Sequence, residues 1–144
     1  MSQDCLFCGI VAGDVPSAKV AETDTTFAFM DIQPGSDGHL LVVPKSHSTD
    51  LCDIPPSDLA DVAIESQRIA KQAFDVWGAD GVNLLNCCGK DAWQSVFHFH
   101  MHVIPRYRDK GKDRLRLPFA PGVRGEAELI EDLAVSMRSA LEDR

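Results

Sequence analysis

Residues 96–106 read VFHFHMHVIPR, and this stretch decides how the rest of the sequence is interpreted. Three of the five histidines in the chain, His98, His100 and His102, occupy alternate positions in it. Because side chains of a β-strand alternate between two faces, this pattern predicts a strand with the three imidazoles on one face. The other face would be apolar and would point into the core; its residues are Phe97, Phe99, Met101 and Val103.

Such a row of imidazoles serves either to hold a metal ion or to carry out chemistry. Neighbouring side chains on one face of a strand are about 6.6–7 Å apart, which places His98 and His102 roughly 13 Å apart. A zinc ion binds histidine nitrogens at about 2.0–2.1 Å, so the three rings do not easily share one ion on a straight strand. The spacing therefore favours different roles for the two ends of the motif.

A second group of metal-binding residue types lies at the N-terminus, where Cys5 and Cys8 form a C-x-x-C pair. This spacing serves zinc binding or redox chemistry, and the redox motif is expected near a βαβ pattern, which does not follow here. Zinc needs two further ligands, for which His47 and His98 are the candidates. Together these four residues would form a closed site, which is structural rather than catalytic.

His100 and His102 would then remain for a substrate. A neutral imidazole nitrogen is a nucleophile near pH 7 and is suited to attack phosphorus. A neighbouring imidazole can donate hydrogen bonds to the phosphate oxygens as charge develops. Gln94 and Ser95 lie just upstream, where a hydroxyl could bind the leaving group or a nonbridging oxygen.

Length, charge and cysteine count limit the class of protein. The 144 residues are expected to form a single domain with a real core. A net charge of −8 disfavours nonspecific nucleic-acid binding. No apolar run approaches the ~20 residues of a membrane span, and the N-terminus MSQDC has no secretory hydrophobic region. Five cysteines, an odd number, favour a reducing compartment, so we expect a cytoplasmic protein.

The remaining patterns predict an α+β domain around an antiparallel sheet, in the order β-β-β-α-β-β-α. Its strands are expected near residues 18–22, 26–31, 39–44 and 81–88 and in the histidine stretch, with PGSDGH as a hairpin turn. A long helix is expected to begin with Ser57 as N-cap and to end before Gly78 as C-cap. A second amphipathic helix is expected from Glu126, with an apolar stripe of Leu129, Leu133, Met137 and Leu141.

Taken together, these motifs resemble the histidine triad (HIT) family of nucleotide-binding proteins, specifically its Hint-like branch. HFHMHVI is similar to the family signature His-φ-His-φ-His-φ-φ, in which φ is apolar. The similarity covers about residues 5–106, including LFCGIVAGDVPSAKV, FAFMDIQPGSDGHLLVVPKSH and GVNLLN…WQSVFHFHMHVIPR, and leaves a tail and helix at 107–144. The resemblance implies an antiparallel five-stranded sheet with two helices, usually in a homodimer.

The resemblance also implies an enzyme of the nucleoside phosphoramidase or nucleotidyl hydrolase type. Its substrate would be a purine nucleoside monophosphate whose α-phosphorus carries an amine, acyl or phosphate leaving group. His100 matches the nucleophile of a covalent nucleotidyl-histidine intermediate, and His102 matches the residue that holds the phosphate oxygens. His98 matches the residue that orients the nucleophile and, in C-x-x-C members, binds structural zinc. His39 matches a fourth histidine that backs the nucleophilic ring.

Further residues match the nucleotide site of the family. Asp31 matches the carboxylate that accepts both ribose hydroxyls, since one carboxylate with two oxygens suits a cis-diol. Asn86 and Ser95 match polar contacts to the phosphate and leaving group, and Gln94 is grouped with them. The apolar slot around the base is matched by Phe7, Phe29, Ile32 and Leu41.

The chain departs from the family at Trp93, where many relatives have a glycine just before the Gln-Ser pair. A bulky ring there would narrow the leaving-group side or pack against a partner chain. Cys52, Cys87 and Cys88 carry no evident role, and we expect them to be buried as small apolar residues.

Two other functions stay open at this stage. One is a zinc-dependent hydrolase in which the H-x-H pattern carries a catalytic metal. The other is a nucleotide-binding adaptor with little turnover, against which the retention of all three triad histidines argues.

Overall fold

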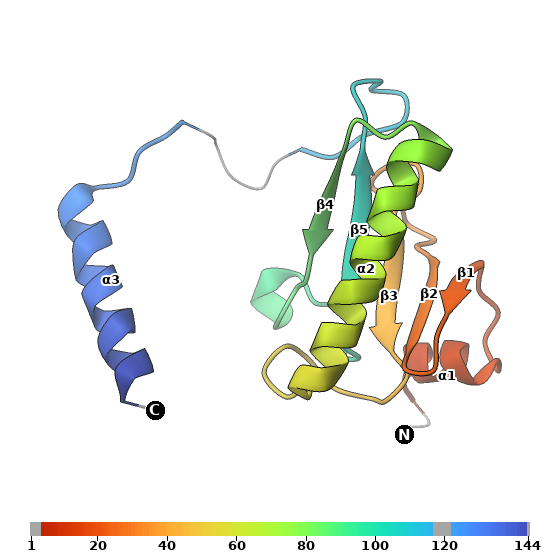
Figure 1. Ribbon diagram of the computed structural model, residues 1–144, viewed down its shortest axis with the longest axis horizontal. Coiled ribbons are helices and arrows are strands. Elements are labelled where there is room, and N and C mark those ends of the chain that lie inside the picture. Colours follow the sequence, from red (N-terminus) through yellow and green to blue (C-terminus); the bar gives the residue numbers. More distant parts are fainter. Residues whose placement is uncertain (1–3, 117–121, 144) are drawn as a thin grey trace.

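The computed structural model describes residues 4–116 and 122–143. Its five strands form one antiparallel sheet in the order β1-β2-β3-β5-β4 (Figure 1). The strands are β1 (Lys19–Glu22), β2 (Thr26–Met30), β3 (Leu40–Pro44), β4 (Gly81–Leu85) and β5 (Met101–Arg106). The helices are α1 (Leu6–Ala12), α2 (Pro56–Trp77), α3 (Ala127–Glu142) and the short 3-10 helix η1 (Lys90–Ala92). The α+β class and the five-stranded antiparallel sheet are confirmed.

Side-chain alternation along β3 divides the core between the two faces of the sheet. Leu40 and Val42 pack on the face that α2 covers, together with residues such as Val62 and Ile69 from α2 (Figure 1). Leu41 and Val43 pack on the opposite face. Phe7 and Ile10 of α1 cover that second face, so the short N-terminal helix completes the core.

The prediction of two helices is wrong, because α1 is a third. This helix has only seven residues, one of which is Gly9, so it is too short to show a helical period in the sequence. The thiol of Cys5 caps the helix by accepting a hydrogen bond from the Cys8 N–H, at 3.3 Å. Gly13 ends it in the left-handed conformation at φ 83°, which glycine adopts without strain.

The long helix α2 also begins differently from the prediction. Its N-cap is Pro55, not Ser57, and no side chain caps its first N–H groups. Pro56 occupies the first turn, where its fixed φ and missing N–H suit the helix start, so Ser57 lies inside the helix. The predicted C-cap is confirmed, since Gly78 has φ 65° and its N–H bonds to the carbonyl of Ala73.

The histidine stretch is only partly a strand. β5 starts at Met101, so His102 lies in the sheet while His98 and His100 lie in the irregular segment before it. Phe99 and Val103 are fully buried as predicted, but Phe97 is 49% exposed and is not a core residue. The strand starts late because β3 pairs with β5 only from Met101 onward.

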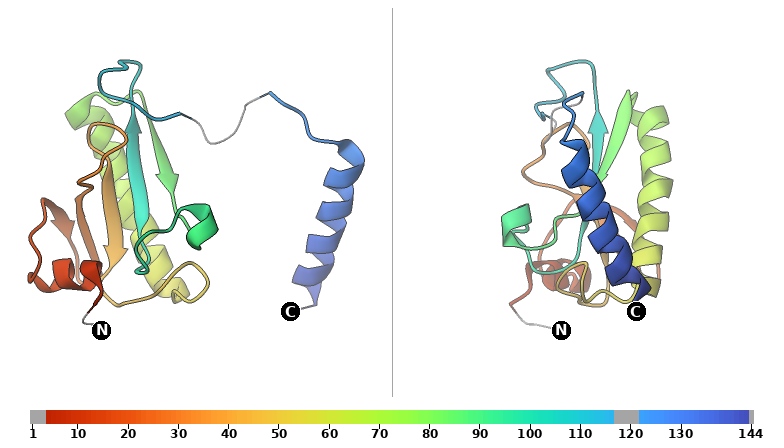
Figure 2. Two further views of the ribbon diagram at one scale, coloured as in Figure 1. Left: turned by 180° about the vertical axis from the view of Figure 1, so that it is seen from behind. Right: turned by 90° about the vertical axis from the view of Figure 1, so that its left-hand side faces the viewer.

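The C-terminal helix α3 lies apart from the rest of the fold (Figure 2). Its helical conformation is confirmed, but its apolar stripe is exposed; the exposed residues include Leu129, Leu133, Met137 and Leu141. Among the described residues, none of the helices combines the length and the apolar character that crossing a bilayer requires.

Candidate active site and metal cluster

The four proposed metal ligands converge between α1, the end of β3 and the segment before β5. The Nδ1 atom of His98 lies 3.4 Å from the Sγ atoms of both Cys5 and Cys8. His47 Nδ1 lies 3.4 Å from Cys8 Sγ. One ligand atom from each of the four residues lies within 4.8 Å of all the others.

This donor set fits a tetrahedral zinc ion. Zinc–sulfur and zinc–nitrogen bonds of about 2.3 and 2.0 Å give a sulfur–nitrogen edge of roughly 3.5 Å, close to the observed separations. The orientation of His98 fits as well, because its Nε2 lies 2.8 Å from the carbonyl oxygen of Pro44. A carbonyl only accepts, so Nε2 carries the proton and Nδ1 presents its lone pair to the thiols.

His100 is buried, and its tautomer is set by the main chain. Its Nδ1 lies 2.8 Å from the carbonyl oxygen of His98, so Nδ1–H must donate and Nε2 keeps a free lone pair. Phe7 contacts the ring edge-on, with centroids 5.1 Å apart. Burial lowers the pKa of His100 below its ordinary value, against the raising effects of the His98 carbonyl and Asp31. The imidazole is therefore neutral at pH 7, as a nucleophile requires.

His102 is held by a chain of hydrogen bonds from the loop between β2 and β3. The Gly35 N–H donates to Nδ1 of His39 at 3.0 Å, so the neutral His39 ring carries its proton on Nε2. That Nε2 lies 2.9 Å from Nδ1 of His102 and 3.5 Å from Oδ2 of Asp31. His102 therefore accepts at Nδ1 and has Nε2–H free to donate. The structure places His39 directly against His102.

The pKa of His102 is lowered to about 4, first by burial and then by the neighbouring His100 and His39. Burial also lowers the pKa of His39, although Asp31 acts in the opposite direction. Both rings are consequently neutral at pH 7, which leaves a directed N–H donor on His102 beside the neutral ring of His100. The His100 and His102 ring centroids are 5.0 Å apart.

The polar residues grouped with the phosphate site have distinct positions. Asn86 donates from Nδ2 to the carbonyl of His100 at 2.9 Å, and its buried Oδ1 has no hydrogen-bond partner among the described residues. Gln94 is buried and links two loops, accepting from the Gly89 N–H and donating to the carbonyl of Thr49. Its amide is thus used for loop packing. Ser95 is exposed and borders a cavity of about 500 Å³ with Cys5 and His47.

The residues grouped with the nucleoside are divided between core and surface. Phe7, Phe29 and Leu41 belong to the buried cluster beneath α1. Asp31 follows β2 and is partly buried, and its Oδ1 accepts the Gln33 N–H at 2.8 Å. Ile32 is 92% exposed, so the structure does not bring it together with the other three apolar residues.

Trp93 has the backbone conformation of a glycine. It caps the end of η1 with φ 71°, and it is the only non-glycine residue with positive φ among those that the structure describes. Its indole is 69% exposed. A residue with a side chain is strained in this left-handed conformation, which glycine adopts freely.

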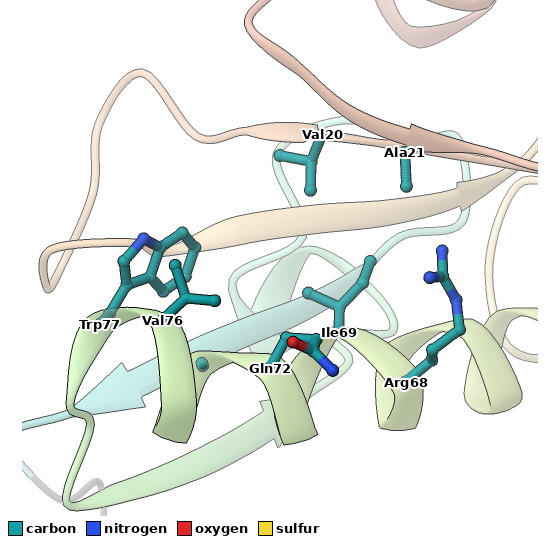
Figure 3. Close-up of a pocket in the computed structure, with 8 residues that line it drawn as sticks. Val20, Ala21, Arg68, Ile69, Gln72, Val76 and Trp77 are labelled. Atoms are coloured by element: carbon teal, nitrogen blue, oxygen red, sulfur yellow. The ribbon is translucent and has the colours of Figure 1, made fainter.

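A separate apolar cavity of about 280 Å³ lies between β1 and α2 (Figure 3). Val20 and Ala21 of β1 face Ile69, Val76 and Trp77 of α2 across it. Its lining includes no histidine, cysteine or carboxylate, so it lacks the groups that the chemistry of the histidine site needs.

Sequence reasoning missed the groups that orient the histidines. These are the Gly35 N–H and the carbonyl oxygens of Pro44 and His98. Main-chain groups leave no residue-type signal in the sequence, so these partners could not be identified from it.

Comparison with known proteins agrees with this geometry. The sequence matches the HIT domain over residues 12–109. It is 42% identical over 106 residues to the adenosine 5'-monophosphoramidase of Saccharomyces cerevisiae, covering 74% of this chain and 65% of the yeast protein. A Zn-bound histidine triad family protein from Mycobacterium smegmatis is 42% identical, with a TM-score of 0.74 over 83% of this chain and 86% of that one. A Streptococcus mutans protein is 33% identical, with a TM-score of 0.88 over 98% of this chain and 87% of that one. The chain belongs to the HIT (histidine triad) family.

Proposed function

We propose that the protein cleaves a substituent from the α-phosphate of a purine nucleoside monophosphate through a covalent intermediate on His100. The observation that carries the proposal is the hydrogen bond from Nδ1–H of His100 to the carbonyl of His98. It leaves Nε2 as an unprotonated nucleophile on a buried, neutral ring.

The chemistry follows from the two tautomers. Nε2 of His100 attacks phosphorus and forms a nitrogen–phosphorus bond, while the bond to the leaving group breaks and its electron pair departs with that group. Nε2–H of His102 donates to a phosphate oxygen as its charge grows. The departing amine takes up a proton from solvent. Water then attacks phosphorus and releases one proton to solvent, the nitrogen–phosphorus bond breaks, and the lone pair returns to His100.

The nucleoside end of the substrate is assigned to Asp31. A carboxylate can accept from both hydroxyls of a ribose, and this one is already held in place by the Gln33 N–H. A phosphoramidate of adenosine is the favoured substrate, because a relative 42% identical to this chain is named adenosine 5'-monophosphoramidase. Phe7, Phe29, Ile32 and Leu41 are the proposed apolar contacts of the base, and Asn86, Gln94 and Ser95 the polar residues around the phosphate.

Zinc is the proposed structural cofactor, held by Cys5, Cys8, His47 and His98. When bound, the ion would supply a fixed cross-link between these groups, without taking part in the reaction. The separations of 3.4 Å between sulfur and nitrogen atoms support this set, and so does the zinc-bound relative. Since the carbonyl of His98 orients His100, this site would also hold the nucleophile in position.

A catalytic metal on the histidines near the nucleophile is less well supported. Asp31, His39 and His102 also have ligand atoms within 4.8 Å of one another. However, the two imidazole nitrogens are 2.9 Å apart and share one proton in a hydrogen bond. Two zinc-bound nitrogens would be roughly 3.3 Å apart, and both would need free lone pairs.

A cytoplasmic homodimer is proposed as the working form. None of the five cysteines, all of which lie within the described residues, forms a disulfide, and this is compatible with a reducing compartment. Apolar side chains are exposed on the edge strand β4, at Leu84 and Leu85, and along α3. A second copy of the chain would cover such surfaces.

The deciding experiment is to trap the intermediate. The full chain is mixed with adenosine 5'-phosphoramidate, quenched in base to preserve the phosphorus–nitrogen bond, digested and analysed by mass spectrometry. An adenylyl adduct on His100 is expected, while His100→Ala should give no adduct and no turnover but should still bind adenosine monophosphate. Turnover in His100→Ala would exclude the proposed nucleophile. Binding without turnover or adduct in the unaltered protein would favour the adaptor.

A further inference from the structure

A second group of thiols lies outside the site described above. Cys52, in the loop between β3 and α2, is exposed, and Cys88, after β4, is half-buried. We expected Cys52, Cys87 and Cys88 to be buried as small apolar residues. This is confirmed for Cys87 and is wrong for Cys52 and Cys88. The Sγ atoms of Cys52 and Cys88 are 3.9 Å apart although 36 residues separate them in the sequence.

A carboxylate completes this group. A ligand oxygen of Asp50 lies within 4.8 Å of both sulfur atoms. The position of Asp50 is fixed, because its Oδ1 accepts the Cys52 N–H at 2.9 Å. Asp53 holds the same turn by accepting the N–H groups of Thr49 and Asp50. The three donor groups are therefore presented by an ordered turn and by the loop that faces it.

The two loops are already joined beside the thiols. The Gln94 side chain donates to the carbonyl of Thr49 and accepts from the N–H of Gly89, which follows Cys88. This amide bridge holds Cys52 and Cys88 near each other without a covalent link. Their proximity is consequently built into the loop packing.

We propose that Asp50, Cys52 and Cys88 bind a thiophilic divalent cation of the zinc type, separately from the cluster at Cys5 and Cys8. Two sulfur ligands on one tetrahedral zinc are roughly 3.8 Å apart, close to the 3.9 Å observed here. A disulfide would instead require the sulfurs to approach to about 2.05 Å. With one carboxylate oxygen as the third ligand, a water molecule takes the fourth position.

The local charge favours a cation. The pKa of the Cys52 thiol is raised, first by its hydrogen bond with Cys88 and then by the nearby charges, including those of Asp50 and Asp53. The same carboxylates attract a divalent cation, which displaces one proton from each thiol as two metal–thiolate bonds form. Metal uptake therefore releases two protons and is stronger at higher pH.

Binding at this site would connect the two loops that flank the reactive histidine segment. The first loop contains Ser48, whose carbonyl accepts the Phe99 N–H at 2.7 Å. The second contains Asn86, which holds the carbonyl of His100. The ion would stiffen the surroundings of His100 without touching a substrate.

The experiment counts zinc bound to the full chain. The protein, kept reduced with a phosphine, is dialysed against buffered Zn²⁺ and analysed for metal per chain by atomic emission. We expect Cys52→Ser/Cys88→Ser to bind one ion fewer than the unaltered protein, whatever the occupancy of the first cluster. Cys87→Ala removes the adjacent buried thiol and should retain the full count. Asp50→Asn keeps an oxygen acceptor for the turn and should weaken the second site about tenfold.

A second measurement does not depend on the fold of a variant. Zn²⁺ should slow alkylation of Cys52 and Cys88 in the unaltered protein, as read from the peptides by mass spectrometry. Equal zinc counts in the unaltered and double-variant proteins would overturn the proposal. Unchanged alkylation rates of both thiols in the presence of Zn²⁺ would do the same.

Discussion

The Nδ1 atom of His100 lies 2.8 Å from the main-chain carbonyl oxygen of His98, the residue whose own ring faces Cys5 and Cys8. One residue thus contributes its imidazole to the cysteine cluster and its carbonyl to the neighbouring ring. Consequently, any change that moves His98 alters the direction in which Nε2 of His100 points.

Loss of one thiol should weaken the fold first and the chemistry indirectly. Cys8→Ser removes a ligand that lies 3.4 Å from both His47 and His98. We expect zinc content to fall and the free energy of unfolding to drop by at least about 2 kcal/mol, because a ligand that binds only the folded state is lost. Zinc analysis and denaturant unfolding measure this, with Cys87→Ala as the control. Complete loss of turnover with unchanged stability would instead mean that the cluster of Cys5, Cys8, His47 and His98 takes a direct part in the reaction.

His39 should act by positioning His102. His39→Ala removes the donor to Nδ1 of His102 and should lower kcat/KM about ten- to a hundredfold. His39→Gln places an amide N–H near the position of Nε2 and should recover part of the activity. Steady-state kinetics with adenosine 5'-phosphoramidate measures both variants. An equal loss of kcat/KM in the two variants would show that the hydrogen bond from residue 39 to His102 does not determine activity.

Stability should decrease in acid partly because His102 resists protonation when folded. Its pKa is about 4 in the native protein and about 6.5 when exposed, so the unfolded chain binds a proton that the folded chain does not. The unfolding free energy should therefore fall as the pH decreases from about 6.5 to about 4, with at most about 3 kcal/mol from this residue. Urea unfolding across this range should show a shallower dependence for His102→Gln. Identical slopes would mean that His102 has an ordinary pKa.

Trp93 should be replaceable with a gain in stability. In Trp93→Gly the left-handed backbone at φ 71° is no longer strained, so we expect about 1 kcal/mol higher unfolding free energy. Trp93→Ala retains a Cβ and serves as the matched control, with little or no gain. Denaturant unfolding should be followed by circular dichroism, because replacing Trp93 also changes the tryptophan fluorescence of the protein. A less stable glycine variant would mean that the exposed indole makes contacts that outweigh the strain.

The sequence was sufficient for much of the fold because apolar periodicity directly reflects burial. The apolar residues 40–43 correspond to β3, which is buried on both faces, and the long helical pattern corresponds to α2. The sequence was misleading where an alternating pattern continued beyond the residues that pair with a neighbouring strand. Phe97 continues the alternation of the histidine stretch, yet it precedes the ladder with β3 and is exposed.

Residue types alone determined the candidate groups of this protein: two cysteines one helical turn apart, three alternating histidines, and Asp31 and His39 in a turn-rich loop. Only the tertiary structure decided which nitrogen of each ring is protonated, because Gly35, Pro44 and the His98 main chain supply the partners. It alone brought Cys52 to Cys88. The physical reason is that a side chain's chemistry is local, whereas the direction of a main-chain N–H or carbonyl depends on how distant segments pack.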